Sequence, residues 1–206
     1  MDVAKFRELP LLGIVRGARP EEIEPLVQTA ASAGLRAIEI AINSRGAPEL
    51  IARAARAAGP GLAVGAGTVL TRDALRSALD AGATFIVTPT LIPDVVGWCR
   101  SNRVPVFPGA LTPTEIWQAW NAGATLVKLF PASLFGPAYC TEIKGPFPQV
   151  DLLACGGVTP ENAKAFLEAG ASAVAFGASV FKKDWLESGR YDRIGEQIRA
   201  LVLAVS

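Results

Sequence analysis

The stretch AGLRAIEI at residues 33–40 recurs along the chain with the same order of features. Similar phrases are AGATFIV at 81–87, AGATLVK at 122–128 and AGASAVAF at 169–176. Each begins with small residues and a Gly that suit the C-terminal end of a helix, and continues into an apolar run typical of a buried strand. Successive copies lie about 40 to 50 residues apart, near the length of two β/α units, so the sequence predicts a repeated architecture.

Further apolar runs complete a set of eight expected strands, with helical segments between them. The runs lack a clean alternation of polar and apolar residues, which indicates strands buried on both faces of a parallel sheet. Such a sheet is either closed or doubly wound, and eight units favour closure. We therefore expect an α/β fold, a (β/α)8 TIM barrel, as a single domain over residues 1–206. The expected strands are 11–16, 37–42, 62–67, 85–90, 105–110, 126–131, 151–157 and 173–178.

Several expected helices have recognisable starts. The segment 20–33 opens with Pro20, which suits the first turn of a helix. Apolar residues at helical spacing mark 47–58, and a Thr cap opens 71–80. Thr159-Pro160-Glu161 repeats the cap-and-proline pattern, so we expect another helix to begin there.

Composition narrows the class of protein. The 206 residues are 50% hydrophobic and carry a formal net charge of +1, which fits one domain with a substantial core. No basic stripe suggests a nucleic-acid partner. The first residues lack the features of a signal peptide, and no uncharged apolar stretch reaches the ~18 residues of a membrane span. We expect a soluble cytoplasmic protein without a membrane or nucleic-acid partner.

Histidine is absent, and the three cysteines form no CxxC pair. A disulfide framework or zinc site is therefore not expected. The absence of imidazole removes the commonest general base and the commonest metal ligand. Any proton transfer must use a carboxylate, lysine, tyrosine, cysteine or water, and no metal or cofactor is expected.

Lys128 is the strongest single signal of chemistry, because it interrupts the apolar run LVKLFP at 126–131. Active sites of these barrels lie at the C-terminal ends of the strands. A buried ammonium is costly, and a lysine neutralised by desolvation is a nucleophile that forms an imine with a ketone. The alternative is a lysine that extends to solvent from a strand edge. The other five lysines, Lys5, Lys144, Lys164, Lys182 and Lys183, are expected to be solvated.

Glu39 is the one carboxylate in the apolar run AIEIAI at 37–42. Imine chemistry needs a group that moves protons, and a glutamate with a raised pKa is the natural candidate where histidine is absent. The alternative is a structural ion pair with a lysine or arginine inside the barrel. A lysine and a glutamate on separate apolar strands favour catalysis.

Glycines after the last two expected strands predict a phosphate site. Gly156-Gly157 and Gly177-Ala178-Ser179 stand where barrels of this type often bind phosphate with backbone N–H groups, and Ser179 can add a hydroxyl donor. Ordinary tight turns are the alternative.

Arg16, after the first strand, suits a carboxylate or a surface ion pair equally. The glycines of 65–68 would bring backbone close to a substrate. Packing or an oligomer contact is expected of Trp98, Trp117, Trp120 and Trp185.

With these residues placed, the chain resembles the 2-keto-3-deoxy-6-phosphogluconate (KDPG) and 4-hydroxy-2-oxoglutarate (KHG) aldolase family. The resemblance runs from about residue 9 to the C-terminus. It rests on the segments IEI at 38–40, GAGTVL at 65–70, VTP at 87–89, PG at 108–109, KLFPA at 128–132 and GGVTPEN at 156–162.

The resemblance implies a metal-independent class I aldolase, without a cofactor, that forms a homotrimer. Its substrate class is a 2-keto-3-deoxy-6-phospho sugar acid, cleaved to pyruvate and D-glyceraldehyde 3-phosphate. 4-Hydroxy-2-oxoglutarate, which gives pyruvate and glyoxylate, is a further substrate of the family. The resemblance assigns Lys128 as the Schiff-base lysine and Glu39 as the general acid/base. The implied substrate-binding residues are Arg16, Asn43, Thr68, Pro89, Phe130, Gly156, Gly157 and Ser179.

Some positions depart from the gluconate-cleaving members. Asn43 stands where many of them have an arginine that binds the substrate's anionic groups, and Cys155 stands where many have threonine. Asn43-Ser44, Val15-Arg16-Gly17 and residues 133–137 look more like the branch that cleaves 2-dehydro-3-deoxy-6-phosphogalactonate. Arg16 would then bind the anionic group that an arginine at position 43 binds in those members. Unspecialised members share Asn-Ser, so the sugar stereochemistry stays open.

Three other functions are compatible with parts of this pattern. A phosphosugar isomerase or epimerase would use Glu39 as base and Lys128 as an electrostatic helper. A class II aldolase would need a divalent metal, which the absence of histidine disfavours. An inactive barrel that assembles through its tryptophan-bearing helices is the third alternative, and a buried lysine disfavours it.

Overall fold

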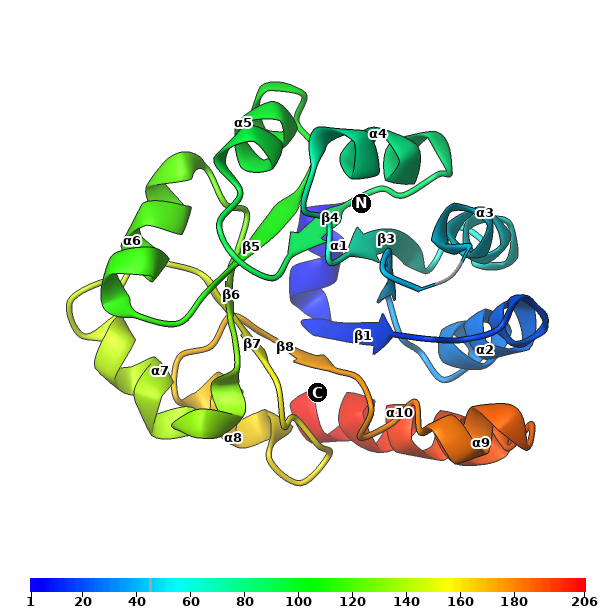
Figure 1. The fold of residues 1–206 in the computed structure, drawn as a ribbon. Coiled ribbons are helices and arrows are strands. Elements are labelled where there is room, and N and C mark those ends of the chain that lie inside the picture. Colours follow the sequence, from blue (N-terminus) through cyan, green and yellow to red (C-terminus); the bar gives the residue numbers. More distant parts are fainter. Residues whose placement is uncertain (45) are drawn as a thin grey trace.

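The computed structural model describes residues 1–44 and 46–206, and its strands form one closed parallel barrel (Figure 1). The strands pair in sequence order, and β8 closes the ring on β1. The predicted TIM barrel is confirmed, and every strand falls within its expected range. The strands are β1 Leu11–Val15, β2 Ala37–Ala41, β3 Ala63–Gly67, β4 Ile86–Thr88, β5 Val106–Ala110, β6 Val127–Leu129, β7 Leu152–Cys155 and β8 Ala173–Phe176.

Helices surround the barrel and cover its outer face (Figure 1). These are α2 Pro20–Ser32, α3 Ala47–Ala57, α4 Arg72–Asp80, α5 Pro93–Ser101, α6 Pro113–Ala122, the 3-10 turn η1 Ala132–Leu134, α7 Pro137–Lys144, α8 Ala163–Glu168, α9 Lys183–Glu187 and α10 Tyr191–Val205. The remaining helix, α1 Val3–Glu8, lies at one end of the barrel. In the part of the chain that the structure describes, no helix has the length and apolarity to cross a membrane.

The glycine of each repeated phrase has the left-handed backbone that ends a helix. The φ angles are +92° at Gly34, +100° at Gly82, +104° at Gly123 and +99° at Gly170. Residues with a Cβ are strained in this conformation, so glycine allows the chain to turn directly from helix to strand. This confirms the interpretation of the repeat.

Helix α8 begins later than predicted, so the expectation of a helix start at Thr159-Pro160 is wrong. The side chain of Asn162 accepts a hydrogen bond from Thr159 N (2.8 Å) and donates one to the Gly157 carbonyl (2.9 Å). These bonds fold residues 157–162 into a turn against the end of β7. The helix starts only after it, at Ala163.

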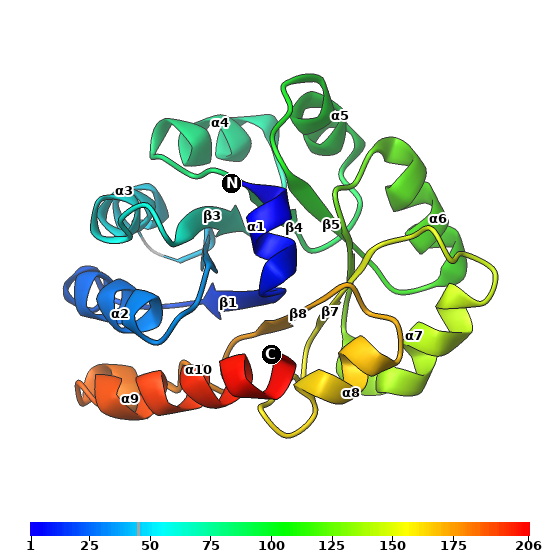
Figure 2. The ribbon, with the colours of Figure 1, turned by 180° about the vertical axis from the view of Figure 1, so that it is seen from behind.

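Aromatic side chains fill the N-terminal half of the barrel. Helix α1 lies across this end (Figure 2), and its Phe6 packs on Phe107 with ring centroids 6.1 Å apart. Phe107 in turn contacts Phe85 at 5.6 Å. The sequence did not predict α1, although Asp2 caps it by accepting bonds from the backbone N–H groups of Ala4 and Lys5. The aromatic rings therefore fill the end of the barrel opposite the C-terminal ends of the strands.

Lys144 differs from the expectation of a solvated lysine. Its Nζ donates to the carbonyl oxygens of Pro148 (2.6 Å) and Val150 (2.9 Å), and its stem packs against Gly170. The lysine therefore ends α7 and holds the loop that leads into β7. The pattern of charges along a helix does not reveal carbonyl partners that come from a following loop.

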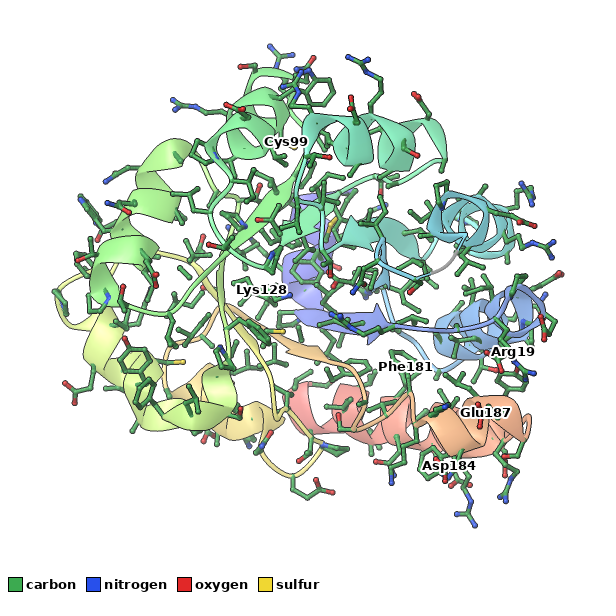
Figure 3. The ribbon with its side chains drawn as sticks, viewed as in Figure 1. Arg19, Cys99, Lys128, Phe181, Asp184 and Glu187 are labelled. Carbon is green, nitrogen blue, oxygen red and sulfur yellow. The ribbon has the colours of Figure 1, made fainter. Side chains whose placement is uncertain are left out.

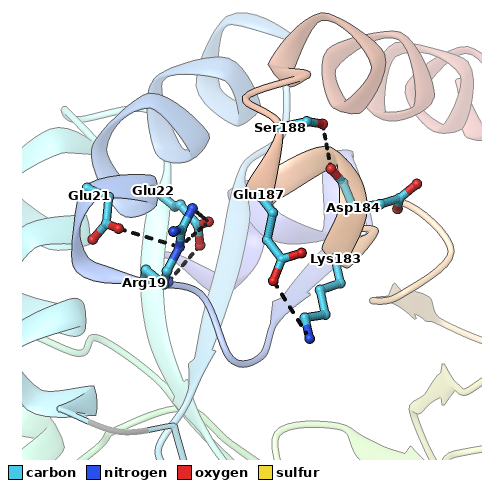
Figure 4. A network of polar contacts seen from close by, with 7 residues as sticks. All are labelled: Arg19, Glu21, Glu22, Lys183, Asp184, Glu187 and Ser188. Atoms are coloured by element: carbon cyan, nitrogen blue, oxygen red, sulfur yellow. Dashed lines mark hydrogen bonds and ion pairs between the residues drawn. The ribbon is translucent and has the colours of Figure 1, made fainter.

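Ion pairs at the start of α2 and within α9 lie on the outer surface (Figure 4). Arg19 contacts Glu22 at 2.6 Å and Glu21 at 3.4 Å, and Lys183 contacts Glu187 at 3.7 Å. Glu22 alone among these is buried, and it also accepts a bond from Arg19 N. Exposed pairs contribute about 0–1 kcal/mol, so only the Glu22 contact is expected to matter for stability.

Candidate active site

Lys128 and Glu39 both face the interior of the barrel. Lys128 on β6 is 7% exposed and Glu39 on β2 is 1% exposed. Figure 3 shows Lys128 near the centre of the ring of strands. The interpretation of Lys128 as a lysine that extends to solvent is therefore wrong. Two titratable groups from separate strands share one buried volume.

The environment of Glu39 favours its protonated form. Burial raises the pKa of Glu39 above its ordinary value of 4.5, while the positive charges of Lys128 and then Arg16 act in the opposite direction. Its Oε2 atom is buried and has no hydrogen-bond partner among the described residues. A carboxyl held in this way can carry a proton under conditions in which a solvated glutamate cannot.

Lys128 and Glu39 influence each other without an ion pair. No carboxylate of the described residues lies within 4 Å of the Lys128 ammonium, and Glu39 pairs with no described lysine or arginine at that distance. The ammonium faces the ring of Phe130, with Nζ 5.3 Å from the centroid. A direct structural ion pair between the two groups is thus not seen among the described residues.

Cys155 ends β7 beside these two groups. Burial raises the pKa of its thiol to about 11, and the nearby Lys128 charge only partly opposes this. The thiol is therefore protonated at neutral pH, and it is a poor nucleophile in that form. Cys155 contributes a small neutral surface next to Lys128.

The turns after β7 and β8 present free backbone donors. Gly156 and Gly157 have φ angles of +105° and +72°. Among the described residues, no acceptor is found for the N–H groups of Gly157, Ala178 and Ser179. The Ser179 hydroxyl, however, donates to the Val158 carbonyl (2.7 Å), so the expected donation from this hydroxyl to an anion is not available in this geometry. The backbone N–H groups remain as anion donors.

Arg16 lies exposed at the mouth, in the turn after β1. It has no carboxylate partner within 4 Å among the described residues, yet its charge partly opposes the rise in pKa that burial causes at both Glu39 and Cys155. The surface ion pair considered for Arg16 is therefore not observed. Gly17 N donates to Ser44 Oγ (3.0 Å), which joins the turn of Arg16 to the turn of Asn43 after β2.

Thr68 and Pro89 follow β3 and β4 at the same edge. Thr68 has a φ of +63°, a conformation that costs a residue with a Cβ about 1–3 kcal/mol and is concentrated at functional sites. The Pro89 carbonyl lies against Gly109, where any side chain would collide with it. Gly109 also pairs with Lys128 in the β5–β6 register. Pro89 and the lysine strand are thus held close together.

A family model described as KDPG and KHG aldolase matches residues 3–197. The chain belongs to this family. Its members are aldolases, and aldolases are lyases, so this protein is a carbon–carbon lyase.

Named relatives of this aldolase carry two different sugar names. A probable 2-dehydro-3-deoxy-6-phosphogalactonate aldolase of Rhizobium meliloti is 36% identical over 85% of this chain and 83% of its own. A 2-dehydro-3-deoxy-phosphogluconate aldolase of Haemophilus influenzae is 34% identical over 97% and 94%. The solved structure described as "Native KDPGal structure" has a TM-score of 0.89 and 33% identity over 96% and 94%.

Some groups that shape the aldolase's site were not predicted from its sequence. Asn162 holds the Gly157 carbonyl, and Ser44 joins the first two turns. Gly109 admits the Pro89 carbonyl. Asn162 had a signal, since asparagine before an apolar run suits a helix cap. The other contacts join strands distant in sequence, so no local pattern reveals them.

Proposed function

We propose that this aldolase cleaves a phosphorylated 2-keto-3-deoxy sugar acid to pyruvate and D-glyceraldehyde 3-phosphate through a Schiff base on Lys128. The observation that carries the proposal is a buried lysine without a described carboxylate partner, in the same volume as a glutamate with a raised pKa. A structural lysine would be expected to have a paired carboxylate.

The reaction begins with addition of the neutral Lys128 amine to the C2 ketone. Protonation of the carbinolamine hydroxyl, with the proton supplied from Glu39 through a water, releases water and leaves an iminium ion. Glu39, now ionised, takes the C4 hydroxyl proton through that water. The C3–C4 bond then breaks, and the aldehyde leaves. The electron pair of the broken bond forms the C2–C3 double bond of an enamine. Glu39 then returns the proton to C3 of the enamine through the water, and hydrolysis of the resulting iminium by one water releases pyruvate, restores the amine and reprotonates Glu39.

Burial suits Glu39 to this sequence of proton transfers. A solvated glutamate has given up its proton well below neutral pH, whereas the desolvated carboxyl retains it to higher pH. The charge on Lys128 also helps Glu39 to release its proton. Once the iminium forms, its nitrogen is positively charged, and this charge stabilises the ionised Glu39 carboxylate. The carboxyl can therefore alternate between donor and acceptor.

Residues at the C-terminal ends of the strands bind the substrate in this proposal. Arg16 binds the substrate carboxylate, for which a guanidinium without a carboxylate partner among the described residues is suited. Thr68, Pro89 and Phe130 line the pyruvyl end, and Asn43 contacts the sugar chain. The backbone donors of Gly156, Gly157 and Ser179 bind the phosphate, where the two glycine turns converge.

A side-by-side assay of pyruvate release tests the substrate class. The substrates are the two C4-epimeric 6-phospho sugar acids and unphosphorylated 4-hydroxy-2-oxoglutarate. We expect at least one phosphorylated acid to be cleaved with the highest kcat/KM, and Lys128→Ala to abolish cleavage while Lys164→Ala retains it. Equal kcat/KM for phosphorylated and unphosphorylated acids would contradict the phosphate site.

A homotrimer is part of the proposal. Exposed and half-buried apolar side chains on α6, η1 and α7 and in the segment after α7 are the candidates for the interface, and we call them the apolar patch: Trp117, Leu134, Phe135, Tyr139 and Phe147. Leu134 is 63% exposed, and two aromatic pairs order the patch: Trp117 stacks on Phe147 at 5.3 Å and Phe135 contacts Tyr139 at 4.9 Å. Ordered aromatic groups exposed together are typical of subunit interfaces.

A further inference from the structure

Two glycines of β3 face the barrel interior, and each leaves space for a side chain from another part of the chain, Glu39 of β2 or Phe85 just before β4. A Cβ on Gly65 would overlap the ring of Phe85. A Cβ on Gly67 would overlap the carboxyl of Glu39, lying only 2.7 Å from its Cδ. Ala66, between them, packs into the outer core instead. The glycine pattern therefore provides room inside the barrel.

Backbone conformation does not require glycine at position 67. Gly67 is the last residue of β3 and is absent from the glycines with positive φ. Any L-residue can adopt an ordinary strand conformation there. The requirement is steric, and the atoms that impose it belong to Glu39. The expectation that these glycines bring backbone close to a substrate is thus replaced at Gly67 by contact with a carboxyl of the chain itself.

The register shows how Glu39 reaches this position. Its backbone pairs with Gly65, yet its carboxyl lies over Gly67, two residues further toward the mouth. Phe85 fills the space over Gly65, one inward-facing position below. No hydrogen bond from a described donor holds Oε2. Packing therefore sets the position of the carboxyl.

We propose that Gly67 is a positioning residue for the aldol reaction, because its missing side chain forms the slot that holds the Glu39 carboxyl in line for proton transfer. The inference rests on the proposed function, since it assigns Gly67 an effect only through Glu39. A methyl group in the slot would displace the carboxyl, and misplacement of a general acid–base group by about 1 Å can cost about 100-fold in rate.

The first test is Gly67→Ala, measured by steady-state kinetics across pH. We expect kcat to fall about 100-fold with KM changed less than about threefold. In the plot of kcat against pH, the acidic limb is expected to shift. Gly65→Ala is the matched control, because its new methyl group meets Phe85 instead of the carboxyl. It is expected to lower the melting temperature and to leave the pH profile in place.

Double variants show whether Gly67 acts through Glu39. In a Glu39→Gln background, Gly67→Ala is expected to lower kcat less than about threefold further, because the group it displaces no longer transfers protons. Glu39→Asp shortens the side chain, so Glu39→Asp/Gly67→Ala is expected to fold and to match Glu39→Asp in kcat. This pair keeps the test valid if Gly67→Ala alone does not fold.

Two outcomes would overturn the inference. One is Gly67→Ala with wild-type kcat and pH profile, and the other is an undiminished loss of kcat in the Glu39→Gln background. Borohydride reduction of the wild-type protein with pyruvate separates failure of the inference about Gly67 from failure of the proposed function. A trapped adduct together with either outcome rejects only the role of Gly67, whereas the absence of an adduct in wild type rejects the Schiff base itself.

Discussion

At the scale of single residues, the site depends on Glu39 being buried without a hydrogen-bond partner for Oε2 among the described residues. Such a group is costly to the fold in its ionised form, because desolvation penalises the charge. The carboxyl is nevertheless kept beside Lys128 and Arg16, whose charges partly offset that penalty. A proton-transfer role explains a position that stability alone disfavours.

Replacing Glu39 should therefore stabilise the protein at high pH. Because its pKa is raised, the folded state holds a proton that the unfolded chain has released, so the free energy of unfolding falls as pH rises from about 4.5 through the folded-state pKa. Glu39→Gln removes this loss. Denaturant melts across pH are expected to show a difference between variant and wild type that grows with pH in this window. A pH-independent difference would contradict the raised pKa.

The three cysteines should be unreactive in the folded protein. Cys99, Cys140 and Cys155 are buried, and burial raises the pKa of each thiol to about 11. Thiolate is the reactive form, so alkylation by iodoacetamide at pH 8 is expected to be slow until denaturant is added. Mass spectrometry counts the modified sites. Rapid native modification of Cys155 would show that the thiol beside Lys128 is ionised or open to solvent.

At the scale of elements, the sequence predicts all eight strands because buried parallel strands carry a local signal of continuous apolar residues. The start of α8 could not be predicted in the same way. Asn162 competes with Thr159 for the role of cap, and contact with the Gly157 carbonyl decides between them. Helix α1 was missed because six residues are too few for a clear period.

Helix α2 offers a test of its first turn. Arg19 contacts both Glu22, which is buried, and Glu21, which is exposed, and Glu22 also accepts a bond from Arg19 N. Glu22→Ala is expected to lower the free energy of unfolding by about 1 kcal/mol, since it removes a cap. Glu21→Ala should change it by less than about 0.5 kcal/mol. Urea melts measure the free energy of unfolding of both variants. Equal losses in the two would show that the buried Glu22 contributes no more to stability than the exposed Glu21.

At the scale of the whole molecule, aromatic side chains fill one end of the barrel, and the proposed site lies at the other. The positions of Lys128 and Glu39 could be predicted because each interrupts an apolar strand, and topology carries both to the same edge. The slot at Gly67 and the engaged Ser179 hydroxyl could not, because each depends on atoms from two strands that only the closed barrel brings together.

The aromatic side chains that fill the N-terminal half of the barrel should contribute strongly to stability. Phe6 is fully enclosed against Phe107, so Phe6→Ala is expected to cost about 3 kcal/mol, because it leaves a cavity under the barrel. For a chain of this size the melting temperature would fall by roughly 10 °C. Leu203→Ala is the control, since Leu203 is 78% exposed. Calorimetry that finds the two variants equally stable would show that α1 does not close the barrel in solution.

Assembly can be tested at the apolar patch. Leu134→Asp puts a charge on the most exposed side chain of the apolar patch and is expected to convert trimers to monomers, because an unpaired charge is costly to bury. Leu203→Asp introduces the same charge on α10, outside the patch, and should leave the trimer intact. Light scattering after gel filtration gives both masses. A monomeric wild-type protein, or a trimeric Leu134→Asp variant, would contradict the assignment.

The Schiff base on Lys128 is tested most directly by reduction with borohydride in the presence of pyruvate, followed by digestion and mass spectrometry. A reduced pyruvyl adduct is expected on the peptide that contains Lys128, and none on peptides that contain the other five lysines. The adduct is expected to be lost in Lys128→Ala. An adduct on another lysine, or no adduct in an active wild-type enzyme, would contradict a Schiff base at this position.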